Sequence, residues 1–387
     1  MFGLIKCKIL PPRNLYFPVL PVRCDGKLLF PLCYTCASTT CLDNCVHNED
    51  ERSLIGTWTT VEINKAVEYG YQMCEIYEIY HYSRQEKKFS EYVNCFLKIK
   101  QEASGYPSEC YDSEGVLNDE KVDKYIKDYR YNEGVQLDKE NIKYNPGLRT
   151  IARNILNALW GKFAQNENNT KVEFLSEYDE LLNLANDKNI DLTSVDFVNE
   201  SVTRVTYKKK EEINVSLKTG NVIVASFVTA YARLELFNLI DKLQKKVLYF
   251  DTDTVIYSCC EGDQPIKMGN YLGELTNELS TDEWITHFCS TGPKSYSYIT
   301  NLNNEIVHIK GFSLNNENVK EKLNFISLHS CLENKNQIIE IKYKDKISRD
   351  KLNHVFKQDE CKTFSFTFNK RVVKNDFYSI PYGFLDS

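Results

Sequence analysis

Several features that would place a protein in a special class are absent from this sequence of 387 residues. We find no stretch apolar enough over about 20 residues to span a membrane, and no signal peptide pattern at the N-terminus. Internal repeats and long low-complexity tracts are absent too. Basic residues are not in excess, since the formal net charge is −6. That charge argues against a general nucleic-acid coat protein, although a local basic groove is compatible with an acidic exterior.

The composition is that of a globular protein, with 42% hydrophobic and 12% aromatic residues. Its length predicts two to three domain-sized units with ample material for a core. The sequence has 14 cysteines. Without a signal peptide, this number argues for free thiols or metal ligands rather than a disulfide framework. We therefore expect an intracellular protein in a reducing compartment, nuclear or cytoplasmic, with no membrane partner.

Four of the cysteines cluster with the spacing Cys33-x2-Cys36-x4-Cys41-x3-Cys45, and His47 follows two residues later. This pattern is typical of a tetrahedral zinc site. The quartet we predict is Cys33, Cys36, Cys45 and His47, with Cys41 as a substitute. A site of four protein ligands has no open position, so its role would be structural. The alternative is a set of free thiols in a loop near buried strands.

Residues 248–257 predict two short strands joined at Asp251-Thr252-Asp253. Residues that favour strands stand on both sides of this acidic triplet. Such a hairpin lifts two carboxylates out of a sheet, and Mg²⁺ prefers oxygen ligands of this kind. Two nearby metal ions can drive phosphoryl transfer. The alternative is an ordinary acidic surface turn.

Residues 146–165 predict a helix with Asn145 as its N-cap and Pro146 at its first position. One stripe is apolar and consists of Ile151, Ile155 and Leu159. Another stripe offers guanidiniums for phosphate, an amide and a flat ring for stacking, from Arg149, Arg153, Asn157 and Trp160. The alternative is a surface helix with ordinary charges.

Other segments have weaker signals. Helices are predicted at residues 59–73, 90–103 and 225–243, and strands at 202–208 and 213–217. Lys98 and Lys100, on the second helix, would either contact a triphosphate or template, or form a solvated face. Lys294 and Tyr296 are predicted on one side of a strand, where they would suit a nucleic-acid backbone.

In order, these pieces resemble the C-terminal half of a protein-primed family B DNA polymerase. Tyr249 to Thr254 resembles the Tyr-x-Asp-Thr-Asp-Ser motif, and Lys294-Ser295-Tyr296 the Lys-x-Tyr motif. Arg153 to Gly161 resembles the Lys-x3-Asn-Ser-x-Tyr-Gly helix, and Thr229 to Arg233 the Thr-x2-Ala/Gly-Arg motif. A finer resemblance, to polymerases of Maverick/Polinton elements and related viral or organellar plasmids, lies at residues 11–15, 56–58, 98–107 and 292–294.

The resemblance implies an α+β fold with palm, fingers and thumb, and a palm that is incomplete at the N-terminus. We find neither the family's Asp-x2-Ser-Leu-Tyr-Pro motif, which carries the other main metal ligand, nor its exonuclease carboxylates, and we expect a fragment that extends primers poorly by itself. The implied domains are a partial palm with a Cys-rich insertion (1–88), fingers (89–165), a palm insertion (166–222), palm (223–300) and a thumb-like region (301–387).

The resemblance also implies roles for the candidate residues. Asp251 and Asp253 would be catalytic and would bind Mg²⁺ or Mn²⁺. Arg149, Arg153, Asn157 and Trp160 would contact the incoming deoxynucleoside triphosphate. Primer-template DNA would contact Thr229, Arg233, Tyr249, Lys294 and Tyr296, and a terminal priming protein is a further expected partner. The alternatives are an inactive polymerase remnant that at most binds DNA or nucleotide, and a zinc-stabilised interaction module.

Overall fold

The structure is a computed structural model that describes residues 1–84, 86–165, 169–210, 220–264, 266–314, 316–350, 354–374 and 378–385. The chain divides into two compact units, each built from stretches that are far apart in the sequence. Unit 1 is Met1–Phe163, Ile223–Glu283 and Lys370–Ser387, and unit 2 is Ala164–Val222 and Trp284–Asn369. Both units combine helices and strands, which confirms the α+β class. The boundaries of palm, fingers and thumb stay predictions.

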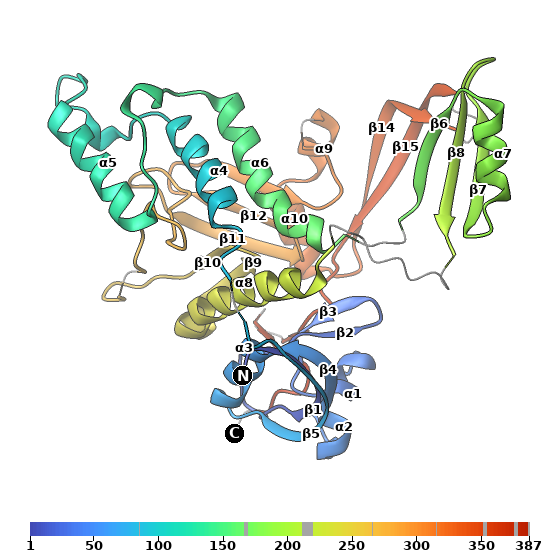
Figure 1. Cartoon of the computed structure of the whole chain (residues 1–387). Helices are drawn as coiled ribbons and strands as arrows, with labels where there is room; N and C mark the ends of the chain where they lie inside the picture. Colours follow the sequence, from blue (N-terminus) through green and yellow to red (C-terminus); the bar gives the residue numbers. More distant parts are fainter. Residues whose placement is uncertain are drawn as a thin grey trace. The chain divides into compact units, whose positions relative to one another are not determined.

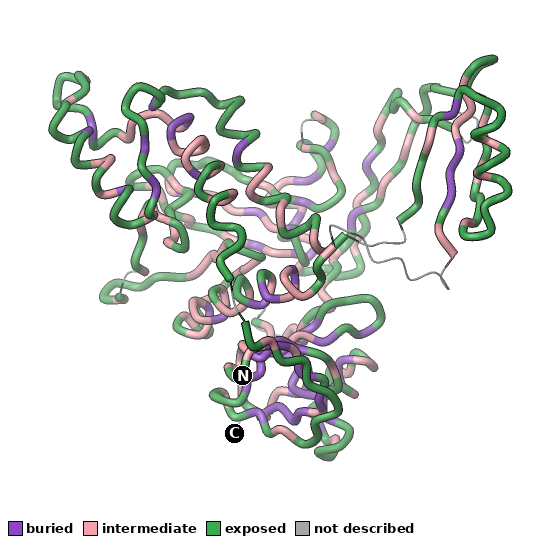
Figure 2. The backbone as a smooth tube through the Cα atoms, in the orientation of Figure 1, coloured by how far each residue is buried: buried purple, intermediate pink, exposed green. Residues whose placement is uncertain are grey.

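Unit 1 contains an antiparallel sheet with the strand order β4-β1-β5 (Figure 1). The central strand β1 (Gly3–Leu10) buries alternate side chains, with Cys7 and Ile9 fully enclosed. This period of two is what a strand with one face on the core requires. Its neighbours are β4 (Leu54–Thr59) and β5 (Gln72–His81), of which β5 is largely exposed. Within this sheet the buried residues lie on β1 and β4 (Figure 2).

The core of unit 1 joins parts of the chain that are distant in sequence. It includes β1, the Cys-rich segment and residues of the C-terminal stretch such as Val372 and Tyr382. Arg371 is half-buried against this core, with its guanidinium over the rings of Tyr16 and Phe17 at 4.9 and 5.2 Å. Burial lowers the pKa of Arg371 to about 10, which leaves the side chain charged at neutral pH.

Helix α3 (Thr60–Glu68) follows β4 directly and begins with a capping box between Thr59 and Glu62. The helix predicted at residues 59–73 is therefore wrong for its last part, because α3 ends at Glu68. Gly70 adopts a positive φ of 85°, and β5 already starts at Gln72. The glycine therefore ends the helix and turns the chain back into the sheet.

Helix α8 (Val222–Leu243) confirms the helix predicted at residues 225–243. Together with the turn that follows, Val222–Lys246 is the one helix in the described residues that is long and apolar enough to cross a membrane, with a mean hydropathy of 1.4. Our prediction from the sequence that no such stretch exists is wrong by these two measures. They are weak evidence for a membrane, because a core helix of a soluble protein passes the same test.

Three helices form the part of unit 1 predicted as fingers. They are α4 (Ser90–Glu102), α5 (Asp119–Glu133) and α6 (Pro146–Phe163). Helices α4 and α6 pack side by side (Figure 1), and both end within about two residues of their predicted ends. A small core around Leu97 and Tyr129 holds α4 against α5.

The described residues of unit 2 contain two three-stranded antiparallel sheets and one two-stranded sheet. The first has the order β6-β8-β7, and helix α7 (Tyr178–Asn186) packs on it (Figure 1). Its strands are β6 (Lys171–Leu175), β7 (Ile190–Phe197) and β8 (Thr203–Lys209). Strand β8 confirms the strand predicted at residues 202–208. The strand predicted at 213–217 lies outside the described residues.

The second sheet of unit 2 has the order β11-β12-β13, and helix α10 packs on it. Its core includes Cys289, Leu328 and Ile341. A long hairpin, β14 with β15, completes the described part of the unit. The elements are β11 (Ile285–Gly292), β12 (Ser295–Thr300), β13 (Glu305–Ile309), α9 (Glu317–Lys322), α10 (Phe325–Glu333), β14 (Ile338–Arg349) and β15 (Val355–Ser365).

Short elements make up the rest of the regular structure. Two short helices, α1 (Tyr34–Ser38) and α2 (Glu49–Arg52), lie within and directly after the Cys-rich segment. The 3-10 turns are Ser108–Cys110, Lys139–Asn141 and Gln244–Lys246. The others are β2 (Val22–Cys24), β3 (Lys27–Leu29), α1 (Tyr34–Ser38), α2 (Glu49–Arg52), β9 (Val247–Asp251), β10 (Thr254–Tyr257), β16 (Val372–Val373) and β17 (Ser379–Ile380).

Candidate active site

The acidic hairpin has the predicted form. Strands β9 and β10 pair antiparallel, with Asp251 opposite Thr254, so Thr252 and Asp253 form the two-residue turn. Asp253 is exposed and Asp251 half-buried. Thr252 has a positive φ of 44°, which costs a β-branched residue on the order of 1–3 kcal/mol. Both carboxylates therefore remain accessible from solvent, on a turn whose backbone is strained.

The hairpin is anchored to the core of unit 1 on one side. Phe250 and its cross-strand partner Val255 pack against that core, and the Phe250 ring meets Phe17 edge-on with 5.7 Å between centroids. Because side chains alternate along a strand, Tyr249 and Asp251 lie on the opposite side from Phe250. Packing of one face thus fixes the direction in which the acidic face points.

The α6 helix begins as predicted. The Asn145 side chain accepts a hydrogen bond from the backbone N–H of Leu148 at 3.0 Å, and Pro146 is the first helical residue. All four residues predicted to contact the nucleotide are exposed. They are Arg149, Arg153, Asn157 and Trp160. The helix therefore presents two guanidiniums, an amide and an indole to solvent.

The apolar stripe of α6 differs in one position from the prediction. Ile151 is 57% exposed, whereas Ala152 is buried. The residues that face the neighbouring helix are thus Ala152, Ile155 and Leu159, at spacings of three and four. In the sequence, Ile151 has the same helical spacing as Ile155 and Leu159. Which side of α6 is buried depends on where α4 packs against it.

A cationic cluster forms where α4 meets α6. Burial lowers the pKa of the Lys100 ammonium, and the nearby charges of Arg149 and Arg153 lower it further. Lys98, two residues earlier on α4, instead pairs with Asp138 at 2.7 Å. The sequence could not separate these two lysines, because only the packing of α4 on α6 shows that Lys100 joins the two arginines.

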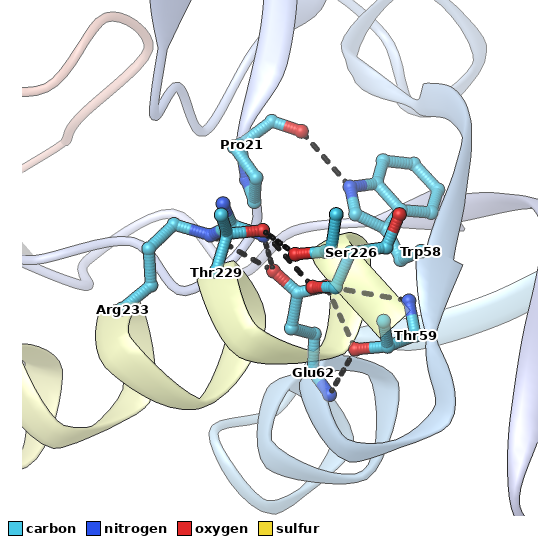
Figure 3. Close-up of polar contacts among 8 residues, drawn as sticks. Pro21, Trp58, Thr59, Glu62, Ser226, Thr229 and Arg233 are labelled. Atoms are coloured by element: carbon cyan, nitrogen blue, oxygen red, sulfur yellow. Dashed lines mark hydrogen bonds and ion pairs between the residues drawn. The ribbon is translucent and has the colours of Figure 1, made fainter. Parts of the chain in front are cut away.

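On α8, the residue predicted to hold DNA is engaged within the protein. Arg233 donates from Nε and Nη2 to one carboxylate oxygen of Glu62, at 3.0 and 2.5 Å (Figure 3). The other Glu62 oxygen accepts from the backbone N–H and hydroxyl of Thr59. Glu62 is 2% exposed. The pair ties α8 to the start of α3, a link between residues 171 positions apart that no sequence pattern indicated.

Thr229 lies one turn before Arg233 on the same helix. Its hydroxyl donates to the backbone carbonyls of Ala225 and Ser226, at 3.1 and 3.0 Å (Figure 3). This local bond is typical of threonine inside a helix. It holds the side chain against its own backbone, so Thr229 and Arg233 both serve the fold in this structure, and their contacts with DNA stay a prediction.

The Lys-x-Tyr segment lies in unit 2 and differs from its predicted form. Lys294 is not on a strand: with Pro293 it forms the turn between β11 and β12, at a φ of 58°. Tyr296 does lie on β12, where its ring is near those of Tyr298 and His308, with centroids 6.4 and 4.9 Å away. The contact of Lys294 and Tyr296 with primer-template DNA stays a prediction.

The Cys-rich segment brings together the predicted quartet. His47 Nδ1 lies 3.5 Å from Cys33 Sγ, 3.2 Å from Cys36 Sγ and 3.7 Å from Cys45 Sγ. All four ligand atoms are within 4.8 Å of one another. Cys41 is not part of the group. All 14 cysteines of the chain are free thiols, so this cluster is not a pair of disulfides.

Comparisons with known proteins identify the family and the fold of the chain. A sequence model of the family described as "DNA polymerase type B, organellar and viral" matches residues 1–111 and 119–245. The match ends before the acidic turn. A DNA polymerase of Kluyveromyces lactis is 23% identical over 256 residues, which are 65% of this chain and 20% of that protein.

Two solved structures of Phi29 DNA polymerase have a similar fold. The orthorhombic crystal form has a TM-score of 0.53 at 12% identity, over 95% of this chain and 51% of that one. The complex with primer-template DNA has a TM-score of 0.50 at 12% identity, over 95% and 50%. This chain thus spans about half or less of these relatives. The family match covers more than half of the chain, and the protein therefore belongs to the organellar and viral type B DNA polymerases.

Proposed function

We propose that this chain takes part in template-directed DNA synthesis, the addition of deoxynucleotides to a primer hydroxyl with release of pyrophosphate. The observation that supports the proposal is that unit 1 contains both of two features. One is the solvent-accessible Asp251 and Asp253 turn, and the other is the cationic cluster of Lys100, Arg149 and Arg153. Phosphoryl transfer needs anionic ligands for metal ions and cations for the triphosphate.

The two carboxylates suit Mg²⁺ or Mn²⁺, because hard divalent cations prefer oxygen ligands. Asp253 would be the principal ligand and Asp251 a supporting one. Bound there, the metal ions would supply neutralisation of phosphate charge and a more acidic primer hydroxyl. The protein contributes rigidity, since Phe250 and Val255 anchor the hairpin in the core. The strained Thr252 in the turn supports a functional role, because such strain clusters at functional sites.

The α6 helix would hold the incoming nucleotide. Arg149 and Arg153 would donate to phosphate oxygens, with Lys100 beside them as a third cation. Arg149 is already oriented by a hydrogen bond from its Nε to Ser104 Oγ at 3.1 Å. Asn157 and Trp160 continue the same exposed stripe, where an indole can stack on a base.

Primer and template strands would be contacted by Tyr249, Lys294 and Tyr296. Contacts of this kind position the backbone without reading sequence, as a replicative enzyme requires. Protein priming, with a terminal protein as partner, and a Maverick/Polinton-like origin are the finer parts of this proposal. They rest on the sequence resemblance alone.

Nucleotide binding tests the proposal most directly. We expect Arg153→Ala to weaken Mg²⁺-dependent binding of a fluorescent deoxynucleoside triphosphate about 10- to 100-fold, since a charge-assisted hydrogen bond contributes about 1.5–3 kcal/mol. Lys98→Ala is the matched control, because the Lys98 ammonium already pairs with Asp138. It removes one positive charge from the same region and should change affinity less than about twofold. Equal losses in both variants would reduce the effect to net charge and contradict the proposal.

The metal ligands have their own test. Asp253→Asn should abolish the Mg²⁺ dependence of nucleotide binding, whereas Asp263→Asn should not, because Asp263 pairs with Lys246 outside the turn. An inactive remnant would bind primer-template DNA, but the Mg²⁺ dependence of nucleotide binding would be the same in Asp253→Asn and Asp263→Asn. A zinc-stabilised interaction module would hold zinc and have no DNA affinity. Anisotropy with labelled DNA and labelled nucleotide therefore separates the three functions.

A further inference from the structure

We infer that Cys33, Cys36, Cys45 and His47 form a structural zinc centre that fastens the C-terminal stretch of the chain to the core of unit 1. This inference does not depend on the proposed polymerase function. It starts from the chemistry of the four side chains. Three thiolates and one imidazole are ligands that zinc prefers, whereas Mg²⁺ and Ca²⁺ take oxygen ligands.

The distances fit a tetrahedron around one zinc ion. Zinc–sulfur bonds of about 2.3 Å and zinc–nitrogen bonds of about 2.0–2.1 Å give sulfur–nitrogen edges of about 3.6 Å. The three observed distances from His47 Nδ1 are 3.5, 3.2 and 3.7 Å. Every ligand atom lies within 4.8 Å of every other. The three sulfur–nitrogen distances therefore match a tetrahedral zinc site to within a few tenths of an ångström.

The surrounding backbone holds the ligands in place. Cys33 is the N-cap of α1, and its Sγ accepts a hydrogen bond from the backbone N–H of Cys36 at 3.4 Å. His47 is fixed through its carbonyl, which accepts from Arg13 Nη2 at 3.1 Å. The next residue, Asn48, starts α2 with a capping box. Cys33, Cys36 and His47 thus stand in or beside backbone that these hydrogen bonds hold in place.

Burial indicates a structural site rather than a catalytic one. Cys33 and Cys36 are 0% exposed and Cys45 is 5% exposed. Apolar packing alone does not explain why three thiols surround one half-buried imidazole, whereas a shared metal ion does. Four protein ligands leave no position for a substrate or an activated water.

The four ligands lie next to the C-terminal stretch, residues 378–385. A Cβ added at Gly383 would be 2.4 Å from Cys33 Cβ. The backbone N–H of Leu32 donates to the Tyr382 carbonyl at 2.8 Å, and that of Leu385 to the Arg13 carbonyl at 2.9 Å. Leu32, which precedes the ligand Cys33, and Arg13, which contacts His47, are therefore hydrogen-bonded to the C-terminal stretch at Tyr382 and Leu385.

The first test measures metal content of the full chain, purified under reducing conditions from cells grown with zinc. Wild type should contain about one zinc per chain, and Cys36→Ser should contain close to none. Cys41→Ser is the matched control, because Cys41 lies in the same segment outside the quartet, and it should keep its zinc. Wild type without zinc, or equal losses in both variants, would overturn the inference.

A second measurement guards against a Cys36→Ser variant that fails to fold. Wild type reconstituted with Co²⁺ should show the intense visible absorption of tetrahedral thiolate coordination. His47→Cys should preserve zinc binding, because it replaces one zinc ligand by another. Weak absorption typical of six-coordinate Co²⁺ would contradict the site.

The third measurement tests the fastening. Removal of zinc by a chelator should increase amide hydrogen exchange in residues 378–385 and leave β14 and β15 unchanged, since those strands belong to unit 2. Exchange in residues 378–385 that does not respond to the chelator would show that the C-terminal stretch is held without the metal. That result would overturn this part of the inference even with zinc bound.

Discussion

The Glu62–Arg233 pair makes the sharpest stability prediction. Arg233→Ala removes both guanidinium hydrogen bonds from a carboxylate whose side chain is only 3% exposed. Loss of one partner from a buried ion pair costs about 3–5 kcal/mol. Arg233 itself is 30% exposed, so the pair is partly screened and we expect the lower end, about 3 kcal/mol.

Removing the acid should cost less than removing the base. Glu62→Ala deletes the capping box, worth about 1 kcal/mol, and releases an arginine that can reach water. We expect about 2 kcal/mol in total. The double variant Glu62→Leu/Arg233→Met should be less destabilised than Arg233→Ala, because it leaves no buried charge uncompensated. This order distinguishes a buried pair from a surface contact.

The assay follows urea unfolding through Trp58, which is 5% exposed on β4 beside this pair (Figure 3). The other two tryptophans, Trp160 and Trp284, are exposed and can be replaced by phenylalanine so that only unit 1 is observed. Glu235→Ala, at an exposed position of α8, is the control and should change stability by less than about 0.5 kcal/mol.

An Arg233→Ala variant that unfolds within about 1 kcal/mol of wild type would refute the reasoning. If that variant also lost affinity for primer-template DNA, Arg233 would be a nucleic-acid ligand, as the sequence resemblance implies. If stability falls as expected while the folded variant binds DNA normally, Arg233 is a positioning residue of the fold.

Two further predictions concern other parts of the molecule. The Tyr69 hydroxyl donates to Asp241 at 2.6 Å, and this bond, followed by burial, raises the pKa of Tyr69 from 10.0 to about 12. The pKa of Tyr69 is higher in the folded state, so its stabilising effect is complete below pH 10 and is lost as the pH rises towards 12. The free energy of unfolding should therefore fall between pH 10 and pH 12, and Tyr69→Phe should remove this pH dependence. Gly292→Ala should cost about 3 kcal/mol or more in thermal or urea unfolding, because its Cβ would lie 2.2 Å from the Thr367 carbonyl oxygen at a φ of 153°. Gly147→Ala, whose Cβ meets only a side-chain oxygen at 3.6 Å, should instead be neutral or stabilising by up to about 1 kcal/mol; the opposite order would contradict the reasoning.

The sequence predicted best where a short segment decides its own structure. The turn at Thr252, the cap at Asn145 and the spacing of the Cys-rich ligands are local features, and the structure has all three. The α3 helix was extended too far because Gly70 was not recognised as its end. Lys294 was placed on a strand because alternation in Lys-x-Tyr resembles a strand even when its first residue occupies the turn.

Contacts between distant segments could not be predicted from the sequence. Glu62 and Arg233 lie on different helices, and neither has a local pattern that names the other. Lys98 and Lys100 are equivalent in sequence, and only their partners, an aspartate for one and two arginines for the other, separate them. The side of α6 that carries Ile151 depends on how α4 packs.

The way unit 1 is assembled has a consequence for synthesis on the ribosome. Its core contains Ile9 near the beginning of the chain together with Val372 and Tyr382 near the end. Strand β1 is therefore synthesised long before Val372 and Tyr382, and it lacks these core partners while all of unit 2 is translated. Newly made chains should be open to chaperones and proteases over this interval, and nascent chains stalled before residue 370 should be digested within unit 1 more readily than the released protein.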